Sequence, residues 1–405
     1  MLDLGVRLRR LQRMLSKPKW VCMVKSCFNV LYIDDDEFML KAASRLLKRL
    51  KPDWSITLIQ DPTTWREFVA SLDSPPDLVM SDLVMPQLRG DMLLEQVSEY
   101  YPSSIRALIT GDTTVDIDSL TNSWTHFILP KPFSEQDFQQ ILNCTERLGN
   151  SPFTAECRKK LSAIEPLPLL PKVIRQLRVS IEDEQCGCVD CVDIIAQEPS
   201  LAAQIIKVAN SAYLGFDTKT SSLNNAVSRL GLNIILALAT AMVSHRAFKR
   251  VSEEQHSEIV GKHQLLAETS VSAAKALSWS PDMQDRVYLV CLLSSIGVLT
   301  LLELGYSDVD CTPDCLNLQT GLRDSDVLSA YLLILWGYDL DLAEANLCLG
   351  NVAMDDEPEN WSIPSVAAFA QDLLENKAKG TLDQWRALLP ESQASLAYAI
   401  LNPVN

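Results

Sequence analysis

Aspartates follow two short apolar runs in the first third of the chain. Asp34 and Asp35 come directly after the run 30–33, and Asp82 comes directly after the run 78–81. Carboxylate oxygens suit a hard cation such as Mg²⁺, which neutralises a phosphoryl group so that a carboxylate can accept it. The pattern therefore predicts a site for phosphoryl transfer, a reaction that depends mainly on positioning and charge stabilisation.

Two further polar side chains follow apolar runs in the same region. Thr110 ends the run 107–109, and Lys131 follows the run 127–129. A lysine ammonium can pair with phosphoryl oxygens, and a threonine hydroxyl can donate a hydrogen bond to them. Any one of these residues has an ordinary explanation, because loops are usually polar. Chance is a poor explanation for the three aspartates, Thr110 and Lys131 together in this order, because the probabilities of independent coincidences multiply.

The apolar runs also predict the element that would bring these side chains together. Between the runs, apolar residues recur at helical spacing, as Phe38, Ala42 and Leu46 do. Five such units predict an α/β doubly wound five-stranded parallel sheet over residues 28–148, with ligand chemistry at the carboxyl ends of the strands. The expected strands are 30–33, 56–59, 78–81, 106–109 and 126–129.

Region 28–148 resembles the receiver domain of two-component response regulators, which has a flavodoxin-like fold. The motifs that carry the resemblance are 30–36, 81–86, 109–110 and 131–133. The resemblance implies that Asp82 accepts a phosphoryl group from a partner histidine kinase or phosphotransfer protein. It also implies that Thr110 and Lys131 sense that group, and that the peptide bond between Lys131 and Pro132 is cis.

The same resemblance implies Mg²⁺ as the cofactor. Asp35 and Asp82 would bind the ion directly, together with the backbone carbonyl of Val84. Asp34 would act largely through water. Such a set is reasonable for Mg²⁺, which usually combines one or two carboxylates with water and phosphate oxygens.

Two residues depart from the receiver pattern. Receivers usually carry Tyr or Phe three residues before the Lys, where this chain has Ile128. The neighbouring Phe127 should point to the opposite face of its strand. The usual aromatic rotamer switch is therefore in question, although phosphorylation is not. Arg89 also replaces an acid that often precedes the loop glycine, which is a milder change.

Helical periodicity replaces the strand pattern in the second half of the chain. Gly149, Asn150, Ser151 and Pro152 stop a helix and predict a linker over 149–154. An all-α domain is expected over 155–365, followed by a helical tail over 366–405. Within the all-α domain, Asn210 and Ser211 are expected to satisfy backbone groups at a helix end rather than to bind a ligand.

The helical half resembles the HDOD domain, a relative of the metal-dependent HD phosphohydrolases that is usually regarded as a non-catalytic signalling module. The motifs that carry this resemblance are 167–171, 197–201, 209–212 and 226–232. The match is good in the first half of 155–365 and weaker later. It implies an output that binds another protein or a small ligand.

Hydrolysis at an HD-type site would require several His and Asp ligands around one or two metal ions. His263 stands at the first ligand position, but the hydrolases' Leu-Leu-His-Asp-Ile-Gly is replaced by Leu-Leu-Ser-Ser-Ile-Gly at 292–297. Hydroxyls replace imidazole and carboxylate poorly, so no enzyme is expected, and His245, His256 and His263 are interpreted as ordinary helix residues. The alternative is a receiver-controlled, metal-dependent cyclic-dinucleotide phosphodiesterase of HD type.

The charge of the chain limits its partners. The 405 residues carry a formal net charge of −16, which argues against electrostatic binding of nucleic acid or an anionic membrane over a broad surface. A DNA-binding response regulator is further disfavoured because no basic recognition helix is recognisable. Residues 1–27 differ, with seven Lys or Arg and one acid. They fit either an amphipathic basic helix or a loose extension.

Two apolar runs, 232–243 and 287–302, fall short of a membrane span and predict buried helices. No transmembrane segment is expected, and eleven cysteines without a secretion signal fit a reducing cytoplasm. The sequence thus predicts a cytoplasmic response regulator of a two-component phosphorelay, with a non-catalytic HDOD output. It leaves the output partner open, and a homodimer remains an option.

Overall fold

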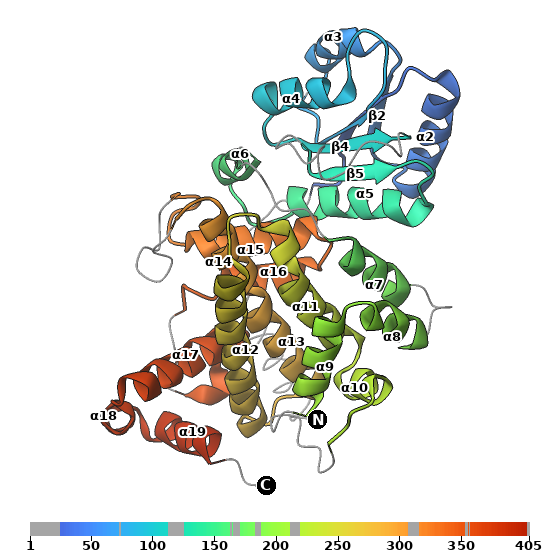
Figure 1. Cartoon of the computed structure of the whole chain (residues 1–405). Coiled ribbons are helices and arrows are strands. Elements are labelled where there is room, and N and C mark those ends of the chain that lie inside the picture. Colours follow the sequence, from blue (N-terminus) through green and yellow to red (C-terminus); the bar gives the residue numbers. More distant parts are fainter. Residues whose placement is uncertain are drawn as a thin grey trace, which may run out of the picture. The chain divides into compact units, whose positions relative to one another are not determined.

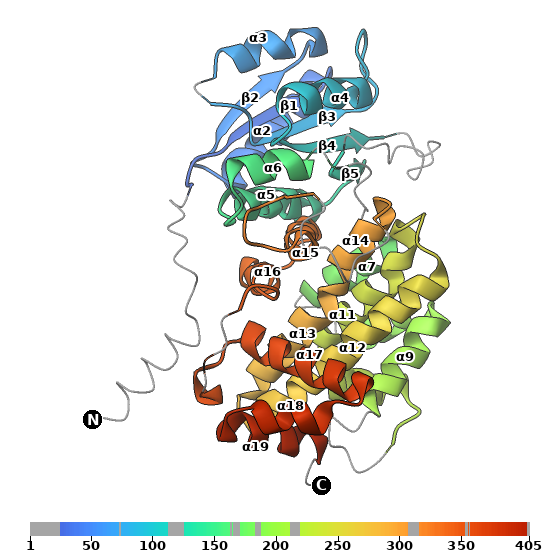
Figure 2. The same cartoon turned by 90° about the vertical axis from the view of Figure 1, so that its left-hand side faces the viewer.

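A computed structural model describes residues 25–72, 74–111, 125–162, 164, 171–182, 188–210, 219–306, 316–352, 355 and 357–402. It divides into two compact units (Figure 1, Figure 2). The α/β unit comprises Val21–Leu169 and Leu333–Leu340, and the helical unit includes Leu170–Leu332 and Asp341–Asn405.

The α/β unit is built on one five-stranded sheet in the order β2-β1-β3-β4-β5, in which every neighbouring pair is parallel. The five predicted strands are confirmed. The sheet order reverses at β1 and β3, which is the switch point where ligands bind in folds of this kind. The strands are β1 (Asn29–Ile33), β2 (Ser55–Ile59), β3 (Leu78–Asp82), β4 (Ile105–Thr110) and β5 (Phe127–Pro130).

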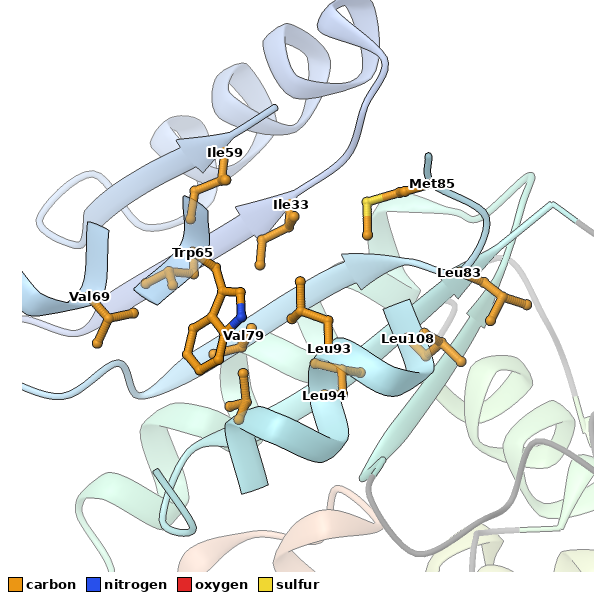
Figure 3. Packing of buried hydrophobic residues seen from close by; sticks show 12 residues of the cluster. Ile33, Ile59, Trp65, Val69, Val79, Leu83, Met85, Leu93, Leu94 and Leu108 are labelled. Carbon is orange, nitrogen blue, oxygen red and sulfur yellow. The ribbon is translucent and has the colours of Figure 1, made fainter. Parts of the chain in front are cut away.

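Helices cover both faces of this sheet (Figure 1). They are α2 (Glu37–Leu50), α3 (Trp65–Ala70), α4 (Gly90–Tyr100) and α5 (Glu135–Gly149), with the short helix α6 (Ala155–Ser162) following. On one face, Trp65 of α3 and Leu93 of α4 pack against Val79 of β3 (Figure 3). On the other face, the ring of Tyr32 in β1 contacts that of Phe138 in α5. The central strand β3 is fully buried, so it can be apolar on both faces.

The described part of the helical unit is built from helices of 7 to 24 residues. The central one is α12 (Glu253–Ala276), which begins with a capping box between Ser252 and Gln255. It packs against α13, α17 and α19. The remaining helices are α7 (Lys172–Glu182), α8 (Cys188–Ala196), α9 (Pro199–Ala209), α10 (Leu223–Leu230), α11 (Leu232–Val243), α13 (Pro281–Leu293), α14 (Ser295–Glu303), α15 (Asp324–Leu335), α16 (Leu340–Leu347), α17 (Ile363–Lys379), α18 (Leu382–Leu388) and α19 (Glu391–Leu401).

The apolar stretch Pro281–Glu303 is long and apolar enough to cross a membrane, but 72% of its apolar window is buried inside the protein. It is therefore a core helix pair rather than a clear span. The other apolar run forms α11, whose residues are almost all buried. Both runs were expected to be buried helices.

Two helices are grouped differently from the domain ranges expected from the sequence. Helix α6 groups with the α/β unit, although 155–365 was expected to form the all-α domain. The expected boundary between 365 and 366 falls inside α17, which packs against α12 and α13.

Candidate functional site

Four of the predicted site residues lie at one edge of the sheet. Asp34 follows β1, Asp82 ends β3, Thr110 ends β4 and Lys131 follows β5. Because all the strands are parallel, their carboxyl ends share that edge. Asp34, Asp82 and Thr110 are all buried there. Strand direction alone thus brings together residues that lie far apart in the sequence.

The ammonium of Lys131 joins two of the aspartates. Its Nζ lies 2.5 Å from Asp82 Oδ1 and 3.2 Å from Asp34 Oδ2. Burial opposes the charge of Lys131, but the hydrogen bond to Asp82 and the two negative charges outweigh it and raise the pKa of the lysine. The lysine is therefore a firmly held cation beside Asp82.

Backbone amides fix the two carboxylates. The amide of Val84 donates to Asp82 Oδ2 at 2.9 Å, and the amide of Asp36 donates to Asp34 Oδ1 at 3.0 Å. Burial raises the pKa of Asp34; the negative charge of Asp82 acts in the same direction, while Asp36 and Lys131 oppose it. The site is thus short of positive charge, which favours a cation.

Asp35 is placed differently from the other acids. Its side chain is exposed, and its backbone carbonyl accepts a hydrogen bond from Gln60 at 3.2 Å. In the described part of the chain, no three His, Cys, Asp or Glu side chains are arranged to hold a metal ion. The donor set nevertheless fits Mg²⁺, which needs only one or two carboxylates and otherwise takes water and phosphate oxygens. Asp34, Asp82, the adjacent Asp35 and the Val84 carbonyl would hold it.

Gly90 is a requirement of the site that sequence reasoning missed. A Cβ at this position would lie 1.9 Å from the backbone oxygen of Asp82. The first residue of α4 therefore has to be glycine for the helix to approach the end of β3 so closely. The signal in the sequence is the loop glycine that follows Arg89, shortly after Met85 and Pro86.

Ile128 occupies the inward position on β5. It is 8% exposed, whereas Phe127 is half-buried. Neighbouring strand residues point to opposite faces, so Phe127 cannot take the place of Ile128. The peptide bond between Lys131 and Pro132 is cis, as expected.

Comparisons with known proteins identify both halves of the chain. The family model of the response regulator receiver domain matches residues 30–143, and that of the HDOD domain matches residues 167–316. The chain carries a receiver domain followed by an HDOD domain. Such a receiver domain belongs to two-component signalling, in which a histidine kinase is the phosphodonor and Mg²⁺ is the typical cofactor.

The curated relatives match well under half of the chain. A protein of Arabidopsis thaliana named as a two-component response regulator, ARR21, is 26% identical over 150 residues, which cover 36% of this chain and 24% of the plant protein. An uncharacterized protein of Treponema pallidum is 26% identical over 92 residues, or 23% of this chain and 18% of that protein. The chain thus matches about a quarter or less of the length of either relative.

Among solved structures, the signal receiver domain of an HD domain-containing protein from Pseudomonas fluorescens Pf-5 is 28% identical, with a TM-score of 0.26. The match covers 28% of this chain and 90% of that domain. An uncharacterized protein from Neptuniibacter caesariensis is also 28% identical, with a TM-score of 0.28 and coverage of 30% and 89%.

In the HDOD domain, the structure brings together the residues at the expected HD positions. His263 Nδ1 of α12 lies 2.8 Å from Ser294 Oγ at the end of α13. The hydroxyls of Ser294 and Ser295 donate to the carbonyls of Cys291 and Leu292, each at 2.7 Å. Both serines therefore satisfy helix carbonyls.

Other polar residues singled out in the sequence have structural partners. Asn210 donates to the carbonyl of Thr220 and accepts from its amide, both at 2.8 Å, so it satisfies backbone groups as predicted. The buried His256 lies 3.0 Å from Ser244 Oγ. Ser211 and the side chain of His245 lie outside the described residues.

Proposed function

We propose that Asp82 accepts a phosphoryl group from a partner histidine kinase or phosphotransfer protein, and that the HDOD domain is a non-catalytic output. The observation that carries this proposal is the position of the Lys131 ammonium between Asp82 and Asp34. A carboxylate beside a fixed cation, at the switch point of a parallel sheet, is suited to accept a phosphoryl group.

The residues of the chain have distinct parts in this reaction. The Val84 amide holds Asp82 Oδ2, so the nucleophile is Oδ1, which the Lys131 ammonium contacts before the phosphoryl group arrives. Its attack on a phosphohistidine forms one P–O bond and breaks one P–N bond, which leaves an acyl phosphate on Asp82. Lys131 then pairs with a phosphoryl oxygen, and Thr110 donates to another. Bound Mg²⁺ would neutralise the phosphoryl charge.

Phosphorylation of the full chain by acetyl phosphate tests the acceptor. We expect a Mg²⁺-dependent, alkali-labile phosphoryl label on the native chain and none on Asp82→Asn. Asp36→Asn is the matched control, because Asp36 is exposed and asparagine also caps helix α2 well. Equal labelling of Asp82→Asn and the native chain would contradict the proposal.

Support for a non-catalytic output comes from His263 and the two serines. Hydroxyls bonded to helix carbonyls are weak ligands for a hydrolytic metal centre. We expect no hydrolysis of a cyclic dinucleotide by the full chain with Mg²⁺ or Mn²⁺. Metal-dependent hydrolysis that disappears in His263→Ala would instead support the phosphodiesterase alternative.

The relay itself can be followed by hydrogen exchange on the full chain. Mg²⁺ with beryllofluoride, a phosphoryl mimic, should change amide protection around Asp82 and also beyond residue 170, because both domains would share one two-state equilibrium. Asp82→Asn should show neither change. Changes confined to the α/β unit would mean that the receiver signals through its own contacts.

A further inference from the structure

The helical unit contains a groove of about 720 Å³ between helices α9 and α12. Residues of α9 line one wall, and one face of α12 lines the other wall from Glu253 to Glu268. Fifteen helical steps correspond to about 22 Å, so the groove has the length of a helix of about 15 residues. His263 is absent from the lining, and the groove is therefore separate from the contact between His263 and Ser294.

The floor of the groove is apolar, and its walls are tied together. Val208 and Val260 are buried in the floor, whereas Leu265 is 52% exposed. Gln204 of α9 donates to Gln264 of α12 through a 2.8 Å hydrogen bond. This bond between the walls keeps the groove formed before a partner arrives, as is usual for binding sites. Burial of the exposed part of Leu265 would favour association with an apolar surface.

Gly261 lies on the lined face of α12 and gives a second indication of a partner. It stands inside a 24-residue helix, where only proline is less favourable than glycine. A Cβ at this position would meet nothing within 4 Å. Packing within the described fold therefore does not require glycine here. Close approach of the backbone of a second helix would require it.

Two carboxylates and one ammonium line the groove. Glu253, Glu268 and Lys207 form no ion pair with any other described residue. By contrast, Glu258 and Lys262, which lie on α12 outside the lining, pair with each other at 3.0 Å. The carboxylates of the groove stand at the two ends of the lined face of α12. A partner with basic ends would therefore complement the groove in sign.

We propose that this groove binds an amphipathic helix of a partner protein that has an apolar stripe and basic residues at both ends. The stripe covers Leu265 and lies against Gly261, and the basic ends pair with Glu253 and Glu268. Recognition of a helix in a groove uses apolar anchors three and four residues apart. The inference rests on the proposed output role of the helical unit. Its test contains no phosphodonor, so its failure is distinguishable from a failure of phosphorylation at Asp82.

Fluorescence anisotropy of a designed peptide tests the groove on the full chain. The probe is a fluorescein-labelled helix of about 15 residues with leucines at spacings of four, three and four and with two arginines at each end. We expect saturable binding with a Kd of about 1–100 µM, and binding at least about tenfold weaker when glutamates replace the arginines. No saturable binding, or equal affinity of the two peptides, would overturn the proposal.

A leucine at position 261 tests the close approach. Gly261→Leu fills the groove and improves helix propensity, so it should fold at least as well as the native chain. We expect it to weaken binding of the basic peptide at least about tenfold, because the peptide can no longer approach α12. Ala378→Leu is the matched control, since it adds the same side chain at an exposed position of α17 outside the groove. It should bind with native affinity.

Charge variants separate the groove from the general acidity of the chain. Glu268→Gln should weaken binding of the basic peptide about two- to fivefold, and Lys207→Gln should strengthen it by a similar factor. Glu391→Gln removes the same charge from an exposed position of α19 outside the groove and should have no effect. Equal weakening by Glu268→Gln and Glu391→Gln would assign binding to net charge and overturn the proposal.

A photo-crosslinker locates the bound peptide. p-Benzoylphenylalanine placed at position 265 should form adducts with the basic peptide. Placed at Leu388, which is 86% exposed on α18, it should form none. Equal yields from the two positions would contradict binding in the groove.

Discussion

Lys131 pairs with two carboxylates at the ends of different strands, and this shared cation leaves the receiver site with a net negative charge. The sequence allowed Asp82 and Lys131 to be selected, because each follows an apolar run and parallel strands bring such positions together. It did not show which oxygen of Asp82 meets the lysine, or that the Val84 amide holds the other. Those contacts depend on loop geometry that has no periodic signal.

The buried hydroxyl of Tyr32, which lies close to this site, lowers the stability of the α/β unit. Its hydroxyl has no hydrogen-bond partner within the described structure, and its pKa is raised by burial and by the nearby Asp34 and Asp82. Tyr32→Phe removes an unsatisfied buried polar group and keeps the ring contact with Phe138. We expect it to raise the free energy of unfolding by about 1 kcal/mol. Urea unfolding measures the change, and a loss of stability would show that the hydroxyl is satisfied.

His126 should make the α/β unit sensitive to acid. Burial, aided by the charge of Arg106, holds its pKa well below the ordinary value, and its Nδ1 accepts from the Arg106 amide. The unfolded chain therefore binds this proton more tightly than the folded chain. The stability contributed by neutral His126 is present above about pH 6.5 and is lost as the pH falls.

His126→Asn tests this linkage, because asparagine can keep an acceptor for the Arg106 amide but does not titrate. Between about pH 5 and 6.5, we expect its free energy of unfolding to fall less steeply than that of the native chain, by up to about 1.4 kcal/mol per pH unit. Urea titrations at several pH values provide the slopes. Parallel slopes for the two proteins would assign the acid sensitivity to other groups.

At the scale of elements, two helix glycines differ in the space that surrounds them. Gly90 lets α4 meet β3, whereas Gly261 faces open space on α12. The strands and the long helices could be predicted because hydrophobic periodicity specifies them. The roles of these glycines could not, since only the positions of neighbouring elements decide whether a Cβ has room.

Replacing each of these glycines by alanine, in separate variants, should therefore change the free energy of unfolding in opposite directions. Gly90→Ala places a Cβ against the Asp82 backbone and should destabilise the α/β unit by about 1–3 kcal/mol. It should also slow phosphorylation of Asp82. Gly261→Ala should stabilise the helical unit by up to about 1 kcal/mol. Denaturant unfolding of the full chain measures the free energy of unfolding of both variants. If Gly90→Ala unfolds with the same free energy as the native chain, α4 can move aside without cost.

At the scale of the whole molecule, the sequence separated an α/β half from an all-α half, and the structure shows both. Where each domain begins and ends depends on packing between helices. Helix α6 carries an ordinary helical pattern, and nothing in its sequence assigns it to the α/β unit. Likewise, α17 continues through the expected boundary because its buried face packs against α12 and α13. Assignment of a helix to a domain depends on its partners.

The apolar helix pair at Pro281–Glu303 should behave as the core of a globular unit. Leu292 is fully buried in it. Leu292→Ala should lower the free energy of unfolding by about 2–5 kcal/mol in buffer without detergent, since it removes packed side-chain volume. Circular dichroism during urea unfolding measures this. A near-zero change would be evidence that this stretch packs against lipid instead.

The order of the strands has a consequence for aggregation. Open sheet edges invite pairing with other chains, and the edges here are β2 and β5. Strand β5 has four residues and ends at Pro130, which has no amide hydrogen to offer a neighbour. Strand addition at that edge would be short and incomplete. Fibril-like association of the receiver would therefore have to start from β2, and charged substitutions there are the ones to choose for concentrated samples.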